Sequence, residues 1–450
     1  MFLQFFVWGS WYSTVSNYLL ARDLGDDIAW AFTVGPIAAI LAPFFLGMVA
    51  DRFFATERVL AVMHFLGGIA LVAAPAVIGL WDGEGWSSPI IVFLFLHMLF
   101  YMPTLGLINT LAFHNLTNRE KQFPMIRVFG TIGWIVAGLV VSWWLKADRA
   151  ETPFYVAGGA GALLGLYSLT LPHTPPPAKG KAVSARDILG LEALTLLRRP
   201  AFFIFIVSSF LVTIPLAAYF PFTPIFASDA GFKDPAAWMT IGQMWEVLFM
   251  IVMPFFFVRL GVKWMLVVGI LAWVIRYGLF AGAAVSGTWW MIIVGISLHG
   301  ICYDFFFVTG QIYVDRVAPV RLRGQAQGFL ILVTLGLGLL IGAQVSGALV
   351  KHYKSENFGE LDAQAIALRT EHETLLEQAD AADNVTATSL EGAAQQKWEA
   401  SIPLRLQTHN WRMIWSIPAI GAAILMLLFI LIFREEEEPL PSGKLPEGEP

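Results

Sequence analysis

Twelve apolar runs restrict the fold of this chain more than any other feature. Each run is long enough for a helix to cross about 30 Å of hydrocarbon. They fall near residues 1–21, 28–50, 59–81, 89–112, 124–147 and 153–172, and near 201–227, 237–259, 263–285, 287–313, 325–350 and 411–433. We therefore expect an all-α membrane protein with twelve transmembrane helices.

The composition supports a chain that is surrounded by a lipid bilayer. Only 14% of its 450 residues are charged, whereas about a quarter are charged in an ordinary soluble domain. The chain also contains 36 Phe and 17 Trp residues, which suits a lipid-facing surface with aromatic belts at its two interfaces. The net charge of −5 is small and distributed, so we expect no nucleic-acid partner.

The runs form two groups of six, and this division predicts the domain organisation. We expect six-helix bundles over 1–172 and 201–433, a Pro-rich basic linker over 173–200, and a cytoplasmic tail over 434–450. Two repeats of six helices are a common transporter architecture.

The basic residues of the short loops predict the orientation. If both termini are cytoplasmic, the inside loops are rich in Lys and Arg, whereas the short outside loops contain only Arg22, Lys146, Arg149 and Lys233. Since Lys and Arg accumulate on the cytoplasmic side, we expect both termini to lie inside.

A long outside loop interrupts the second group at 351–410. Its stretch "DAQAIALRTEHETLLEQADAAD" is rich in Ala, Glu and Leu, which predicts one or two soluble helices. The loop is either a lid or partner site, or a surface insertion that the fold tolerates.

The two halves share one short motif. "GMVADRFFATER" follows the second run, and "FFFVRLGVKW" follows the eighth. A glycine and charges in a tight turn let two helices approach closely. These stretches resemble the loop signature of the major facilitator superfamily, and we assign a conformational role to Gly47, Asp51, Arg52, Arg259, Gly261 and Lys263.

Three ionisable residues lie inside apolar runs of both halves, namely Arg127, Glu246 and Asp304. Helical spacing places further polar or aromatic residues on the same faces: Thr131 and Trp134 with Arg127, Gln243 with Glu246, and Gln311 with Asp304. Polar stripes of this kind normally face a water-filled cavity.

The charge balance of these three residues predicts proton coupling. Two carboxylates and one guanidinium leave one surplus negative charge. Because burial disfavours the charged form of a carboxyl group, Asp304 or Glu246 is expected to bind and release a proton. Ion pairing that only locks the helices is the alternative. Arg276 is either a fourth member of this group or a partner of a backbone carbonyl.

No motif of an enzyme is present. The chain lacks HExxH, a P-loop, paired CxxC and G-x-S-x-G. We therefore expect no catalytic activity, no cofactor and no bound metal. Gly158, Gly161 and Gly165 have the spacing of close helix packing.

Several stretches together resemble the nucleoside:proton symporters of the major facilitator superfamily: "FLQFFVWGSW", "YMPTLGLINT", "FPMIRVFGTIGW", "TLPH", "LGLEAL", "AWVIRYGLFA" and "YDFFF". The resemblance implies the major facilitator fold, a location in the cell inner membrane, and nucleoside import driven by protons. It assigns substrate or coupling roles to Arg127, Thr131, Trp134, Gln243, Glu246 and Asp304.

The chain departs from this family in its seventh run. There the family has a Gln and an Asn for substrate, whereas "TIPLAAYFPFTP" has Pro215 and Ala218 at about those places. Substrate contacts must then come from elsewhere, and the candidates are Tyr219, Thr223, Asn109 and Gln311. Trp134 and Tyr303 offer rings for stacking on a base, although ordinary core packing would also account for them.

The most consistent interpretation is a monomeric, proton-coupled nucleoside importer that works by alternating access. A proton symporter for another small polar solute, such as a sugar, has the same features. A membrane sensor that binds a nucleoside without transporting it is the alternative from another class.

Overall fold

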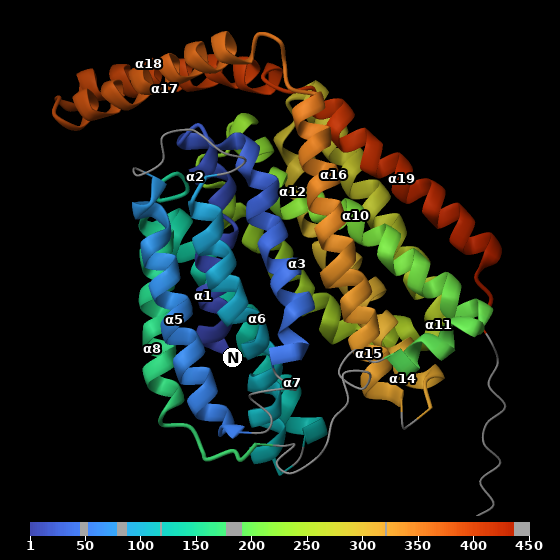
Figure 1. The fold of residues 1–450 in the computed structure, drawn as a ribbon. Helices are drawn as coiled ribbons and strands as arrows, with labels where there is room; N and C mark the ends of the chain where they lie inside the picture. Colours follow the sequence, from blue (N-terminus) through green and yellow to red (C-terminus); the bar gives the residue numbers. More distant parts are fainter. Residues whose placement is uncertain (46–52, 79–87, 118, 177–190, 320–321, 436–450) are drawn as a thin grey trace, which may run out of the picture.

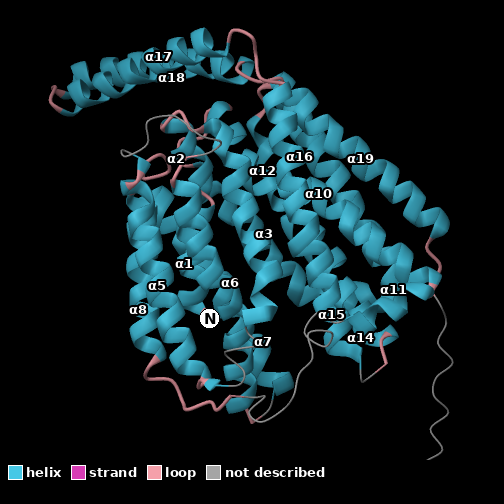
Figure 2. Ribbon diagram, viewed as in Figure 1, coloured by secondary structure: helices cyan, strands magenta, loops and turns pink. Residues whose placement is uncertain are grey.

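The computed structural model describes residues 1–45, 53–78, 88–117, 119–176, 191–319 and 322–435. All regular structure in this part of the chain is helical, and no strand occurs there (Figure 2). The apolar runs form long helices because the helix satisfies every backbone polar group within its own segment. The prediction of an all-α membrane fold is confirmed.

The first half contains α1 (Phe2–Tyr12), α2 (Val15–Ala21), α3 (Ile28–Phe45), α5 (Thr56–Ala76), α6 (Ile90–Asn115), α7 (Arg119–Gly138) and α8 (Thr152–Ser168). The π-helical turn η4 (Leu139–Trp144) extends α7. These helices pack mainly on one another, and α5 contacts both α6 and α8 along its length. Figure 1 shows them in blue to teal.

The predicted small-residue packing explains how α5 and α8 approach so closely. A β-carbon at Gly158 would lie 2.8 Å from the carbonyl oxygen of Gly68, and one at Gly165 would lie 2.9 Å from that of Ala61. Only hydrogen atoms fit at these distances. Van der Waals contact between backbones is therefore what joins this helix pair.

The second half begins after the short helix η5 (Leu191–Arg198). It contains α10 (Pro200–Asp229) and α11 (Pro235–Ser286). After α10 and α11, the third helical rod of this half is a series of consecutive helical elements. It consists of α12 (Trp289–Ser297), α13 (His299–Tyr303), the π-helical η6 (Asp304–Val308) and α14 (Thr309–Val317). A fourth rod is built from α15 (Arg323–Ile331), the π-helical η8 (Leu332–Gly338) and α16 (Leu339–His352), and α19 (Trp411–Ile432) completes this half.

Nine helices of the described ranges are long and apolar enough to cross a membrane. That number counts α11 once and leaves out the 17-residue α8 and the α1–α2 pair. The number of twelve spans remains a prediction. The three spans by which it exceeds nine correspond to the second part of α11, to α8 and to the α1–α2 pair.

Gly261 divides the 52-residue α11 where the sequence predicted a loop between two helices. Its φ of 65° and ψ of −179° lie outside the helical region, and glycine adopts such a conformation without steric cost. Nearby, Arg259 stacks on the ring of Phe255 at 3.5 Å, and Lys263 donates to the carbonyl of Ile430 at 2.8 Å. The matching residues of the first half, Gly47, Asp51 and Arg52, lie outside the described residues.

The 351–410 insertion folds into a hairpin of two long helices, α17 (Phe358–Asp380) and α18 (Asn384–Gln407). Asp383 begins α18 by accepting hydrogen bonds from the backbone of Val385 and Thr386, and such caps satisfy the free N–H groups of the first turn. The backbones of Lys354 and His409 form an isolated antiparallel bridge at the base of the hairpin. Figure 1 shows the hairpin beyond one end of the bundles, which we call the hairpin end.

The two halves meet between the middle of the molecule and the hairpin end. Gln344 of α16 donates to Thr33 of α3 at 2.8 Å, and α7 meets α11 where Gly138 faces Thr240. Close to the hairpin, Lys351 pairs with Asp26 at 3.1 Å. The described contacts therefore hold the halves together at the hairpin end.

Candidate functional site

Asp304 lies at the start of the π-helical turn η6, in the middle of the third rod of the second half. Its side chain is 0% exposed, and neither carboxylate oxygen has a hydrogen-bond partner. An ionised carboxylate without partners is very unfavourable in such a place. Asp304 is thus a buried carboxyl group for which the neutral form is favoured.

The π-helical turn also changes which residues share a face with Asp304. The sequence placed Gln311 on the same face, seven residues further on. A π-helical turn contains an extra residue relative to an α-helix, so the face rotates, and Gln311 is exposed in a shallow pocket of 370 Å³ with Asp315, Arg316 and Gln327. The expectation of a shared face is wrong, and a substrate role for Gln311 stays a prediction.

Glu246 of α11 faces the same region from the neighbouring helix. It is buried, and its Oε2 lies 4.0 Å from Nε2 of His299. The charges of Glu246 and Asp304 are close enough to interact. Two carboxyl groups therefore share one interior region, as the sequence analysis expected.

Arg127 of α7 faces Glu246 from the first half, at a longer range. The two charges interact electrostatically, but among the described residues no ion pair joins Arg127 to either carboxyl group. Its guanidinium instead stacks on the ring of Phe5 at 4.5 Å. In this conformation the positive charge stands beside the carboxyl pair without neutralising it by direct contact.

Aromatic rings from both halves contact one another around Trp134, on the same helix as Arg127. Trp134 of α7 contacts the rings of Trp8 and Tyr12 in α1, at 5.5 and 5.9 Å, and that of Phe220 in α10, at 5.9 Å. The contact with Phe220 crosses from one half to the other. Trp134 is half-buried, so part of its ring stays open beside this boundary.

A second set of rings continues this surface within the second half. His299 stacks on Tyr219 at 5.0 Å, and Tyr303 stacks on His299 at 6.0 Å. The hydroxyl of Tyr219 is buried without a hydrogen-bond partner. Tyr219 and His299 are buried, and both contact Phe220, which joins these rings to Trp134.

The remaining predicted residues differ in their surroundings. Thr131 and Gln243 are buried, and Oε1 of Gln243 lacks a partner. Asn109 is half-buried on α6. Of these three, Gln243 offers the clearest unmet hydrogen bond.

Three further residues belong to this region that the sequence analysis left out of its candidate set. Gln4 of α1 is fully buried, donates to Thr104 at 2.7 Å, and keeps Oε1 without a partner. It is the only amide in the aromatic stretch "FLQFFVW", and this was a usable signal. His299 also lies inside an apolar run, but a packing role was the expectation there, and Trp8 carries no such signal, because Trp is common in membrane helices.

Arg276 is a partner of a backbone carbonyl, which is the second of the two roles considered for it from the sequence. Its Nε donates to the carbonyl oxygen of Gly295 at 2.9 Å, and its guanidinium lies 4.2 Å from the ring of Tyr219. Tyr219 is therefore held between Arg276 and His299. Arg276 thus positions one of the rings that line the site.

Glu246 and Asp304 come close together because Gly300 allows their helices to touch. A β-carbon at Gly300 would lie 2.7 Å from the backbone of Trp245 and Glu246. We expect Gly300→Ala to lower the free energy of unfolding by about 1–3 kcal/mol through overpacking, which a lower midpoint of thermal unfolding in detergent would show. The control is Gly278→Ala, since no atom lies within 4 Å of that position. Equal midpoints for the two variants would contradict this packing.

Comparisons with known proteins show the family of this chain. The sequence model of the family described as Nucleoside H+ symporter matches residues 1–377. The putative nucleoside transporter YegT of Escherichia coli is 33% identical over 99% of this chain and 95% of its own length. The nucleoside permease NupG of the same organism is 33% identical over 78% of this chain and 86% of its own.

Solved structures show the same architecture. The crystal structure of the nucleoside transporter NupG superimposes with a TM-score of 0.75 at 27% identity, and covers 97% of each chain. A bacterial homolog of the human lysosomal transporter Spinster has a TM-score of 0.63 at 15% identity over 97% of this chain and 96% of its own. That second likeness shows the fold alone.

Proposed function

Because the chain belongs to the nucleoside H+ symporter family, we propose that it imports nucleosides together with protons by alternating access. The observation that carries this proposal is the fully buried, unpartnered carboxyl group of Asp304 beside an aromatic surface formed by both halves. A site at the boundary between two repeats is where transporters of this architecture bind substrate.

The aromatic surface provides the nucleobase contacts in this proposal. Base–aromatic stacking contributes about 1–3 kcal/mol per base, and it tolerates both purines and pyrimidines because every base has a π-face. Trp134 is the strongest candidate, since it contacts rings of both halves. Half-buried Tyr303 continues the surface, whereas Tyr219 is enclosed between Arg276 and His299 in this conformation. Gln243, Thr131 and Gln4 offer hydrogen bonds to polar atoms of base or ribose.

Asp304 and Glu246 carry the proton in this proposal. Placing two ionised carboxylates in one buried region is costly, and one proton removes both the repulsion and much of the desolvation cost. Movement of Arg127 toward or away from the pair would change that cost between conformations. The proton is then taken up when the site opens to one side and released when it opens to the other.

In this proposal the protein lies in the inner membrane, and one chain is the working unit. Both termini lie in the cytoplasm and the hairpin end lies outside. This orientation rests on the asymmetry of Lys and Arg between the loops. Because the described contacts between the halves gather at the hairpin end, the structure then represents a state that is closed toward the outside.

Uptake competition in proteoliposomes tests the substrate class. With a pH gradient imposed, excess uridine or adenosine should compete with labelled nucleoside, whereas excess glucose should not. Competition by glucose would favour a sugar carrier. Binding of nucleoside without accumulation would favour the membrane sensor.

A Trp134→Ala variant tests the aromatic surface. We expect its affinity for nucleoside to fall about 5- to 150-fold, which corresponds to the loss of about 1–3 kcal/mol of stacking, while Trp134→Phe should retain most of the affinity. Calorimetric binding to purified protein measures this directly. Trp144→Ala is the matched control, since Trp144 is 75% exposed further along the same helical rod. An unchanged affinity for Trp134→Ala would remove this ring from the site.

A further inference from the structure

The turn between α10 and α11 is held on one side by a loop of the first half. This loop, residues 145–151, follows η4 and contacts the second half at three points. Lys146 pairs with Asp234 at 2.6 Å, Asp148 accepts from the backbone N–H of Ala236 at 3.2 Å, and Arg149 donates to the hydroxyl of Ser228 at 3.1 Å. We call these three contacts the outer latch.

Asp148 is the most buried of the three loop residues in the outer latch. It is 7% exposed and accepts a second hydrogen bond, from the hydroxyl of Ser142 at 2.6 Å. Burial raises the pKa of Asp148 to about 6, so the group is mostly ionised at pH 7 and accepts both bonds. A negative charge near the first turn of α11 is also favourable for that helix. The outer latch is therefore a specific contact between the halves.

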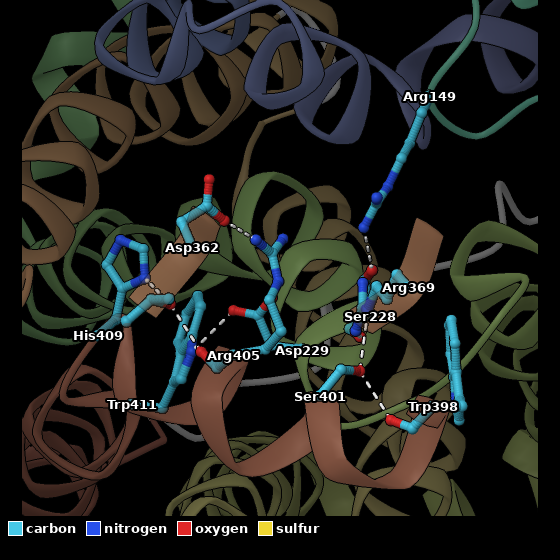
Figure 3. A network of polar contacts seen from close by, with 11 residues as sticks. Arg149, Ser228, Asp229, Asp362, Arg369, Trp398, Ser401, Arg405, His409 and Trp411 are labelled. Carbon is cyan, nitrogen blue, oxygen red and sulfur yellow. Dashed lines mark hydrogen bonds and ion pairs between the residues drawn. The ribbon is translucent and has the colours of Figure 1, made fainter. Parts of the chain in front are cut away.

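The hairpin holds the end of α10, next to the same turn. Arg405 of α18 pairs with Asp229 at 3.0 Å and with Asp362 of α17, and the indole of Trp411 donates to Asp229 at 3.1 Å. Arg369 of α17 donates to the carbonyl oxygen of Ser228 at 2.9 Å. Figure 3 shows Ser228 between Arg369 of the hairpin and Arg149 of the first half.

The hairpin also fits the turn itself. Gly231 has a φ of 94°, and a β-carbon there would lie 2.6 Å from the side chain of Ile402 in α18. Lys233 lies 5.1 Å from the ring of Trp398, in the same helix. The turn is thus enclosed between the hairpin and the loop that forms the outer latch.

The charges of this region act in both directions, so the geometry of the contacts decides. The carboxylates of Asp148, Asp229 and the hairpin residue Glu373 attract the guanidinium of Arg149, whereas Arg405 and Arg369 repel it. Arg369 is 7% exposed and forms a second bond, to the hydroxyl of Ser401 at 3.2 Å. Such a buried, doubly bonded side chain restrains its partners more than an exposed ion pair does.

We propose that the α17–α18 hairpin is a brace for the outer latch. By holding Ser228 and Asp229, Arg369 and Arg405 act as positioning residues that present the α10–α11 turn to the first half. The brace thereby favours the conformation that is closed at the hairpin end. This inference rests on the proposed function only because closure at one end is a step of alternating access.

A distance measurement between the halves tests the brace without requiring transport. Spin labels are placed at Gly25→Cys and Ser286→Cys, two exposed sites outside the latch and the hairpin contacts, in a Cys302→Ala background. Arg369→Ala should increase the fraction of molecules with a longer distance between labels. The matched control is Lys397→Ala, which removes an ion pair with Glu371 inside the hairpin and should leave the distances unchanged.

A second variant, which lacks the whole hairpin, keeps the test decisive if Arg369→Ala merely unfolds the hairpin. Residues 357–406 can be replaced by a short glycine-rich turn, because Tyr353 and Asn410, and Ser355 and Thr408, are already hydrogen-bonded across the base. Asp229→Asn in the same chain prevents a buried carboxylate from losing its partner. We expect the longer distance here too. Unchanged distances in this variant would overturn the brace, whereas a shift in a chain that transports no nucleoside would retain the brace and reject the proposed function.

Discussion

Asp304→Asn is expected to abolish the accumulation of nucleoside against a gradient. The substitution keeps the shape of the side chain and removes the group that binds the proton. The asparagine needs no proton to be neutral in a site where the carboxyl group has no partner. The proton gradient and the membrane potential together support several-hundred-fold accumulation. In this variant, concentrative uptake should therefore fall to about equal concentrations on both sides.

Exchange experiments separate coupling from folding in this variant. Because the neutral form of the site is preserved, we expect Asp304→Asn to bind nucleoside and to exchange internal for external nucleoside. Asp315→Asn is the control, since Asp315 is exposed in the same rod and should not affect accumulation. If Asp304→Asn still concentrates nucleoside, another residue carries the proton, and Glu246 is the next candidate.

Uptake is expected to be electrogenic and to depend on the proton gradient. One proton that enters with a neutral nucleoside moves one net charge. A membrane potential of about 100 mV then contributes about 2.3 kcal/mol, and one pH unit adds about 1.36 kcal/mol. The sum of about 3.7 kcal/mol supports several-hundred-fold accumulation, because each 1.4 kcal/mol is about tenfold.

Vesicles in which potential and pH are set independently provide the measurement. Uptake should rise as the external pH falls, increase with an inside-negative potential, and collapse with a protonophore. Replacing sodium by choline serves as the control and should change nothing, because in this proposal the proton supplies the charge that is moved. A requirement for sodium, or accumulation that ignores both gradients, would contradict proton symport.

Most of the helices were predictable from the sequence because hydrophobicity is a local property. A run of about twenty apolar residues forms a membrane helix whatever its neighbours are, so the long helices fall where the runs do. Gly261 was also readable, since a glycine between Arg259 and Lys263 indicates a break in a helix. The hairpin at 351–410 follows from its Ala-, Glu- and Leu-rich composition.

Candidate residues of the site were predictable for a related reason. A charged or amide side chain inside an apolar run is costly, so Arg127, Glu246 and Asp304 were conspicuous without any structure. The same rule would have identified Gln4. It does not identify Trp8, whose importance depends on which rings it meets.

The sequence by itself determined the membrane class, the helices and the identity of the buried charges. Only the tertiary structure decided which of those charges lie close together and that Gln311 lies on another face than Asp304. It also decided that the hairpin contacts the α10–α11 turn, which the outer latch joins to the first half. The physical reason is that these relations depend on how each helix is rotated about its axis and on contacts between distant segments. A single π-helical turn at η6, or a glycine that admits a neighbouring backbone at Gly300, changes them without altering the hydrophobic pattern.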